Sequence, residues 1–113
     1  MIRFKLTPRT ESLRPHLQEL LIYSGIQNVT VEVGRERTSS DIFVNEDECA
    51  TLEDVLSKFA LQIHDGNVHK NYTKASVISL SAKHGSSASK IASVIEKAIE
   101  PAYFFTLDRV PLA

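Results

Sequence analysis

Cysteine is nearly absent from this sequence of 113 residues, since Cys49 is the only one. A single cysteine excludes an internal disulfide, and it excludes a structural zinc site built on several thiolates. Both exclusions fit a reducing compartment, so we expect a cytoplasmic protein. Cys49 stands just before a predicted helix, where a small, half-buried structural residue is the simplest interpretation.

An excess of charge of either sign is also missing, because 13 basic side chains stand against 14 acidic ones. Domains that bind duplex nucleic acid gather Lys and Arg on one face, since phosphate neutralisation dominates their affinity. This charge balance therefore disfavours nucleic acid as a partner. Disorder is disfavoured as well, because 42% of the residues are hydrophobic and the net charge is only −1.

Long hydrophobic runs are missing. No uninterrupted apolar run is longer than that of residues 20–23, which is far too short to cross a bilayer. Residues 1–5 alternate between apolar and basic side chains, whereas a secretory signal has a basic stretch followed by an apolar one. We therefore expect no membrane association, and a single domain over residues 1–113.

Secondary structure is indicated by the spacing of the apolar residues. Alternation or β propensity predicts strands over residues 2–6, 29–33, 41–44, 75–82 and 103–107. Helical spacing predicts helices from Ser12 to Gly25, from Thr51 to Ile63, and from Gly85 to Pro101.

The resulting order, β-α-β-β-α-β-α-β, indicates an α/β protein of the mixed, α+β type. Its first four strands and two helices fit the ferredoxin-like split βαβ core, which the third helix and fifth strand would extend. We expect a mixed or antiparallel sheet with helices mainly on one face. The strand over residues 103–107, added last, is expected at the edge of that sheet.

A candidate ligand site lies where the fourth predicted strand meets the third helix. A helix N-terminus has unpaired N–H groups and partial positive charge, which suit a phosphate. Serine hydroxyls supply further hydrogen-bond donors, and lysines supply further positive charge. A simple helix cap is the competing interpretation. The candidate residues are Lys83, Gly85, Ser86, Ser87, Ser89 and Lys90, together with Arg35 and Arg37 from the polar loop after residue 34.

Two further clusters contain side chains that can bind metals or transfer protons. His64, Asp65 and His69 could hold a metal or act as a base, although their spacing fits a helix end followed by a polar loop equally well. The acidic triplet Glu46–Glu48 precedes a helix, where negative charge is favourable without any cation. We therefore predict no catalytic residue, metal ligand or cofactor.

Three functions remain open. The leading hypothesis is a non-catalytic binding or assembly module, a homo-oligomer formed through an edge or a face of its sheet. The alternative is a regulatory domain that senses a small phosphate-bearing ligand or nucleotide at residues 83–90. A small hydrolase or metal enzyme that uses His64, Asp65 and His69 is the third.

Overall fold

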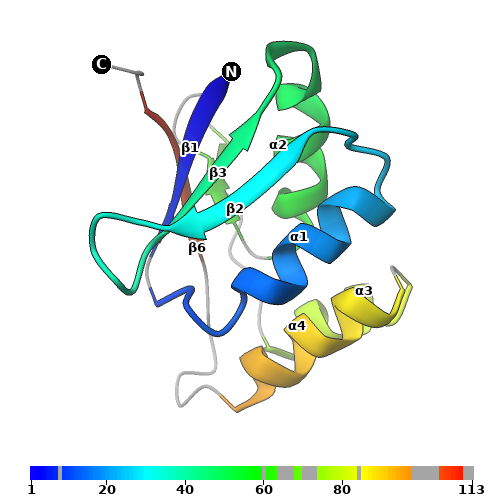
Figure 1. The fold of residues 1–113 in the computed structure, drawn as a ribbon. Coiled ribbons are helices and arrows are strands. Elements are labelled where there is room, and N and C mark those ends of the chain that lie inside the picture. The colour runs from blue at the N-terminus through cyan, green and yellow to red at the C-terminus, as the bar shows by residue number, and fades with distance from the viewer. Residues whose placement is uncertain are drawn as a thin grey trace.

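The computed structural model describes residues 1–7, 9–59, 61–63, 68–69, 74–83, 85–97 and 105–110. These residues form an α+β fold, in which a six-stranded sheet lies against four α-helices (Figure 1). The predicted class, α and β elements in one mixed fold, is confirmed. The predicted element order is not the observed one.

The sheet is antiparallel apart from one pair of strands. Along the sheet the order is β2-β3-β1-β6-β4-β5, and only β4 and β6 run parallel. The strands are β1 (Ile2–Thr7), β2 (Val29–Val33), β3 (Ser40–Val44), β4 (Leu61–Ile63), β5 (Val68–His69) and β6 (Phe105–Val110).

The helices are short and begin without side-chain caps where the cap is described. They are α1 (Arg14–Tyr23), α2 (Cys49–Ser57), α3 (Lys74–Ser81) and α4 (Ser86–Glu96), and a 3-10 turn, η1 (Glu46–Glu48), precedes α2. At the end of α1, the Gly25 and Ile26 N–H groups donate to the carbonyls of Ile22 and Leu21, which ends the helix where the sequence predicts. Within the described chain, no helix is both long and apolar enough to cross a membrane.

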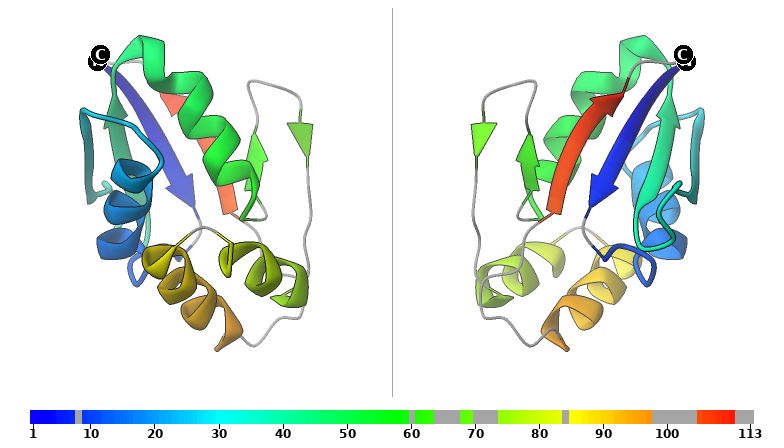
Figure 2. Two further views of the ribbon diagram at one scale, coloured as in Figure 1. Left: turned by 90° about the vertical axis from the view of Figure 1, so that its right-hand side faces the viewer. Right: turned by 90° about the vertical axis from the view of Figure 1, so that its left-hand side faces the viewer.

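Alternation along the strands divides the sheet into two unlike faces. Phe4, Leu6 and Ile42 are buried on one face, against buried residues of α1, α2 and α4. Arg3, Lys5 and Phe43 lie on the other face and are only half-buried. In the right-hand view of Figure 2, β6, β1 and β3 lie in front of α2, so α2 covers one face of the sheet, whereas α3 and α4 lie below the ends of these strands.

The predicted strand over residues 75–82 is wrong, because this segment is the helix α3. The adjacent Val77 and Ile78 suggested a strand. In the structure Val77 is fully buried, whereas Ile78 and Leu80 are half-buried and Ala75 is exposed. This segment packs against α4 as a helix. Its secondary structure is therefore determined by tertiary packing and not by local propensity.

The predicted second helix is too long. It ends at Ser57 in the structure, and Leu61–Ile63 forms β4, which pairs in parallel with Phe105–Leu107 of β6. Phe59 and Ile63 continue the helical spacing of the apolar residues, although both lie beyond the end of α2.

The predicted edge position of the last strand is also wrong. β6 lies inside the sheet, between β1 and β4. Tyr103 and Phe104, the first residues of the predicted strand, lie outside the described residues. The two edges of the sheet are instead β2 and β5.

Candidate functional site

Among the described strands, none pairs with the outer edge of β2, which leaves main-chain groups there without a strand partner. The Gly34 N–H donates to the Ser39 carbonyl at 3.0 Å, and the β2–β3 register continues without a break from this pair. Hydrogen-bonded pairs alternate in an antiparallel ladder, so Thr30 and Glu32 bond to β3. Val29, Val31 and Val33 must then direct their N–H and C=O groups away from β3, toward the free edge.

This edge has few of the features that usually protect an edge strand. Proteins protect edge strands with charged side chains, lysine above all, with proline or bulges, or by keeping the strand very short. The sequence Val-Thr-Val-Glu-Val of β2 contains neither Lys nor Pro, its one charged side chain is the exposed Glu32, and all five residues pair with β3 in register. The opposite edge, β5, is only two residues long. β2 is therefore the edge that is open to another strand, and it is drawn in front in Figure 1.

A polar network holds the loop between β2 and β3 in place. From the start of α1, Arg14 donates through Nε to the Ser40 Oγ at 3.0 Å, and through Nη2 to the carbonyls of Ser39, at 3.0 Å, and Arg37. The buried Thr10 lies 2.6 Å from the same Ser40 hydroxyl, and its N–H donates to the Thr38 carbonyl at 2.7 Å. The loop is thus fixed to the segment before α1.

Gly34 is required by this arrangement because the loop folds tightly onto the end of β2. A Cβ at Gly34 would collide with the Ser39 hydroxyl, which donates to the Glu36 carbonyl at 2.7 Å. The glycine therefore preserves both the hairpin and the course of its edge.

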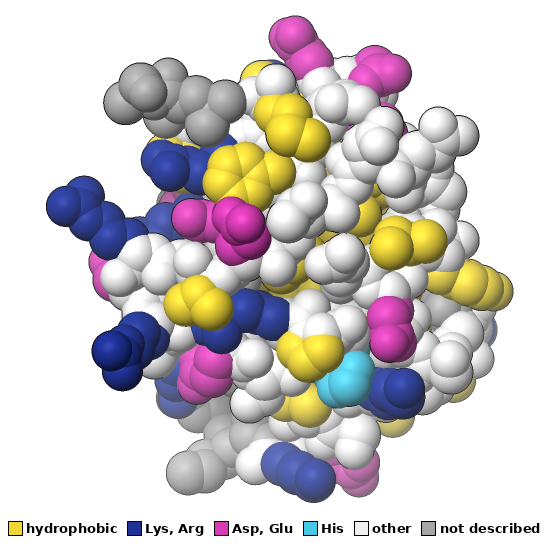
Figure 3. Space-filling view, in the orientation of Figure 1, with side chains coloured by type: hydrophobic (Ala, Val, Ile, Leu, Met, Phe, Trp, Pro, Cys, Tyr) yellow, Lys and Arg dark blue, Asp and Glu magenta, His cyan; other side chains and the backbone are white. Residues whose placement is uncertain are grey.

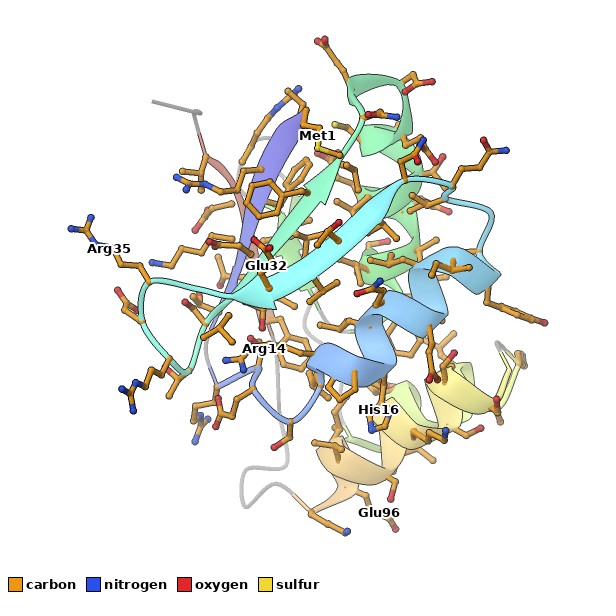
Figure 4. The ribbon with its side chains drawn as sticks, viewed as in Figure 1. Met1, Arg14, His16, Glu32, Arg35 and Glu96 are labelled. Atoms are coloured by element: carbon orange, nitrogen blue, oxygen red, sulfur yellow. The ribbon has the colours of Figure 1, made fainter. Side chains whose placement is uncertain are left out.

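The loop carries positive charge at its tip. Arg35 and Arg37 are both exposed, and Arg35 points away from the molecule (Figure 4). Between them, Glu36 forms an ion pair with Lys5 at 3.4 Å. The loop thus places two guanidinium groups just beyond the C-terminal end of β2.

Negative charge lies at the other end of the same strand. Val44 at the end of β3 is paired with Val29 at the start of β2, so η1 with its three acidic residues follows beside that start. The Glu48 carboxylate accepts a hydrogen bond from the Gln27 N–H at 2.8 Å, which ties η1 to the residues before β2. Figure 3, which looks onto the β2 edge, shows acidic side chains at the top and most Lys and Arg on the left.

At the predicted phosphate site, α4 begins at a glycine and without a side-chain cap. Gly85 is the N-cap, with φ 93°, in the left-handed region that favours glycine. Space beside it is restricted, because a Cβ there would lie 3.3 Å from the Tyr23 ring. Ser87 is buried, and the Ser89 hydroxyl donates back to the Gly85 carbonyl at 3.3 Å.

The cationic residues predicted for that site are not brought together. Lys90 forms an exposed ion pair with Glu19 of α1 at 3.9 Å, and Lys83 lies in the turn after α3. Arg35 lies on the opposite side of the molecule, so the structure separates the arginine loop from residues 83–90. Phosphate binding at residues 83–90 stays a prediction.

The third predicted cluster is described only in part. His64 and Asp65 lie outside the described residues, and His69 belongs to β5. Within the part of the chain that the structure describes, no group of three or more His, Cys, Asp or Glu side chains could hold a metal ion.

Cys49 is a buried structural residue at the first position of α2. Burial raises the pKa of its thiol above the ordinary value; the opposing effect of Arg109 is smaller. Its Sγ donates to the Asn45 carbonyl at 3.6 Å. A thiol held in its protonated form is a poor nucleophile and a poor metal ligand.

Two features of this region were not predicted from the sequence. The valines of β2 predict a strand, but the sequence of a single strand does not show whether that strand lies at the edge of its sheet. Arg14 gives no signal either, because its acceptors lie on a loop more than 20 residues further along the chain.

Comparison of this chain with family models, curated proteins and solved structures found no match.

Proposed function

We propose that this chain is a non-catalytic binding and assembly module, which works by adding a strand to the free edge of β2. One result supports the proposal above all: the β2–β3 register turns the N–H and C=O groups of Val29, Val31 and Val33 toward the outer edge of the sheet, where no described strand pairs with them. Strand addition satisfies such groups with main-chain hydrogen bonds, while neighbouring side chains select the partner.

Side chains beside the edge support this mode of binding. Val33 is 58% exposed, although it lies on the same face as the buried Val29 and continues that apolar row. A strand placed alongside β2 would cover it. The Arg14 network supports the proposal in another way, because an edge held in one conformation loses little entropy on binding.

We also interpret the strands β2, β3, β1 and β6, together with α1 and α2, as a split βαβ core of the ferredoxin-like kind. In this interpretation β4, β5, α3 and α4 are an insertion before the last core strand. One edge of the core is then covered by the inserted β4, and the other edge, β2, stays open.

Amide hydrogen exchange tests the proposal residue by residue. The probes are the protein itself at rising concentration and a peptide with the sequence of residues 27–34. Pairing should slow exchange at Val29, Val31 and Val33, while Thr30 and Glu32, already bonded to β3, change little. A peptide of the same composition in scrambled order is the control. Unchanged exchange at all three valines with both probes would overturn the proposal.

A further inference from the structure

We infer that the strand added to β2 is β2 of a second copy of this chain, which runs antiparallel with Val31 at the two-fold axis. This inference depends on the proposed function, and it names the partner and the register. Three independent features of the edge favour it.

The outward main-chain groups favour this register. A two-fold axis perpendicular to the sheet keeps the buried faces of both copies on the same side, so residues on the same face must pair. With Val31 opposite Val31 of the second copy, Val29 lies opposite Val33. Each of these pairs directs its N–H and C=O groups across the interface, so every outward group of one β2 meets a partner.

The side chains on the other face favour the same register. Centring on Val31 places Thr30 opposite Glu32 of the second copy. Centring on Glu32 would place two carboxylates opposite each other, which is destabilising. Centring on Thr30 would leave the exposed Val33 without a valine opposite it.

The charges at the two ends of β2 favour the antiparallel direction. Arg35 and Arg37 follow the end of β2, and η1, with its three acidic residues, lies beside its start. Antiparallel pairing brings the arginine loop of each copy toward η1 of the other. Parallel pairing would instead place η1 beside η1. Opposite charges at matched ends direct two copies into one orientation.

Disulfide trapping tests the inference. In the expected dimer, Thr30 and Glu32 of the second copy form a non-hydrogen-bonded pair, with Cα atoms about 4.5 Å apart, and a disulfide can bridge that distance. The variants Thr30→Cys and Glu32→Cys are each prepared with Cys49→Ala, mixed, and oxidised with oxidised glutathione. We expect the mixed pair to become cross-linked at least tenfold faster than either variant alone, while Cys49→Ala by itself does not react.

The possible outcomes separate the inference from the proposed function. Faster trapping of Thr30→Cys alone, or of Glu32→Cys alone, would overturn the register. If nothing is trapped but the peptide of residues 27–34 slows exchange at Val31, the second copy is the wrong partner and strand addition survives. If nothing is trapped and exchange at Val31 does not change, both proposals fail.

Discussion

At the scale of single residues, Arg14 has the largest effect on the proposed edge. Its guanidinium donates to Ser40 Oγ and to the carbonyls of Ser39 and Arg37. We predict that Arg14→Ala lowers the free energy of unfolding by about 1–3 kcal/mol, because the buried residues Ser39 and Ser40 lose a donor. Arg14→Lys should recover only part of this loss, because an ammonium lacks the planar fork. Urea unfolding measures both.

The control for Arg14 is Arg35→Ala, because Arg35 is exposed at the tip of the same loop. This change should alter the free energy of unfolding by less than about 0.5 kcal/mol. Equal effects of the two alanine variants would show that the Arg14 network does not stabilise the loop.

Cys49 gives a prediction about pH. Burial is the main cause that raises the pKa of its thiol in the folded state, whereas the thiol of an unfolded chain ionises at about pH 8.5. Below that value both states keep the proton, and the thiol adds no pH dependence. As the pH rises from there through the folded pKa, the unfolded state releases its proton first, so stability falls. Urea midpoints at pH 7 and pH 9.5 measure this loss, and Cys49→Ala should reduce it. A variant that loses as much stability as the wild type would contradict this role.

At the scale of elements, α1, α2 and α4 each contribute a large aliphatic side chain to one core. Leu17 of α1, Leu56 of α2 and Ile95 of α4 are all buried. Replacing each with alanine should lower the free energy of unfolding by about 2–5 kcal/mol, the usual cost of such a cavity. Thermal or urea unfolding of the three variants checks this, and Ile22→Ala, at an exposed position of α1, is the control. A helix whose variant unfolds like the wild type does not contribute to the core.

Much of the fold could be predicted from local patterns. The alternation of residues 29–33 gives β2 with its observed bounds, and helical spacing finds α1 and α4. The segment of α3 was misassigned because Val77 and Ile78 have strand propensity, and only packing against α4 makes it a helix. The edge position of β2 could not be predicted at all, because the order of strands in a sheet depends on long-range pairing that no local pattern contains.

At the scale of the whole molecule, the charge distribution predicts how two copies associate. Replacing Arg35 and Arg37 with Glu should weaken dimerisation, since both loops would then approach acidic residues. The expected increase in Kd is about 2- to 30-fold, from roughly 0.2–1 kcal/mol for each of two exposed contacts. Replacing Glu46 and Asp47 with Lys should have a similar effect.

The combined variant is the decisive control for these charges. In a chain with all four replacements, the charges at the two ends of β2 are exchanged. Opposite charges then face each other again, and the dimer should recover most of its affinity. Sedimentation velocity at low salt measures all three variants, and the differences should shrink at high salt. If the combined variant is weaker than both partial ones, the two ends of β2 do not meet.

The central claim is that the outward main-chain groups of β2 bind a strand, and that this strand belongs to a second copy. Val31→Pro removes one outward N–H while leaving the bonds to β3 intact, which edge strands tolerate. Val31→Thr keeps that N–H and is the matched control. Val33→Lys guards the edge with a charge at an exposed position, and circular dichroism checks that each variant is folded. Sedimentation equilibrium at micromolar concentrations should show a species of twice 12.6 kDa for the wild type and for Val31→Thr, and a monomer for Val31→Pro and Val33→Lys. A wild-type chain that stays at 12.6 kDa, or a dimer that persists in both edge variants, would contradict the claim.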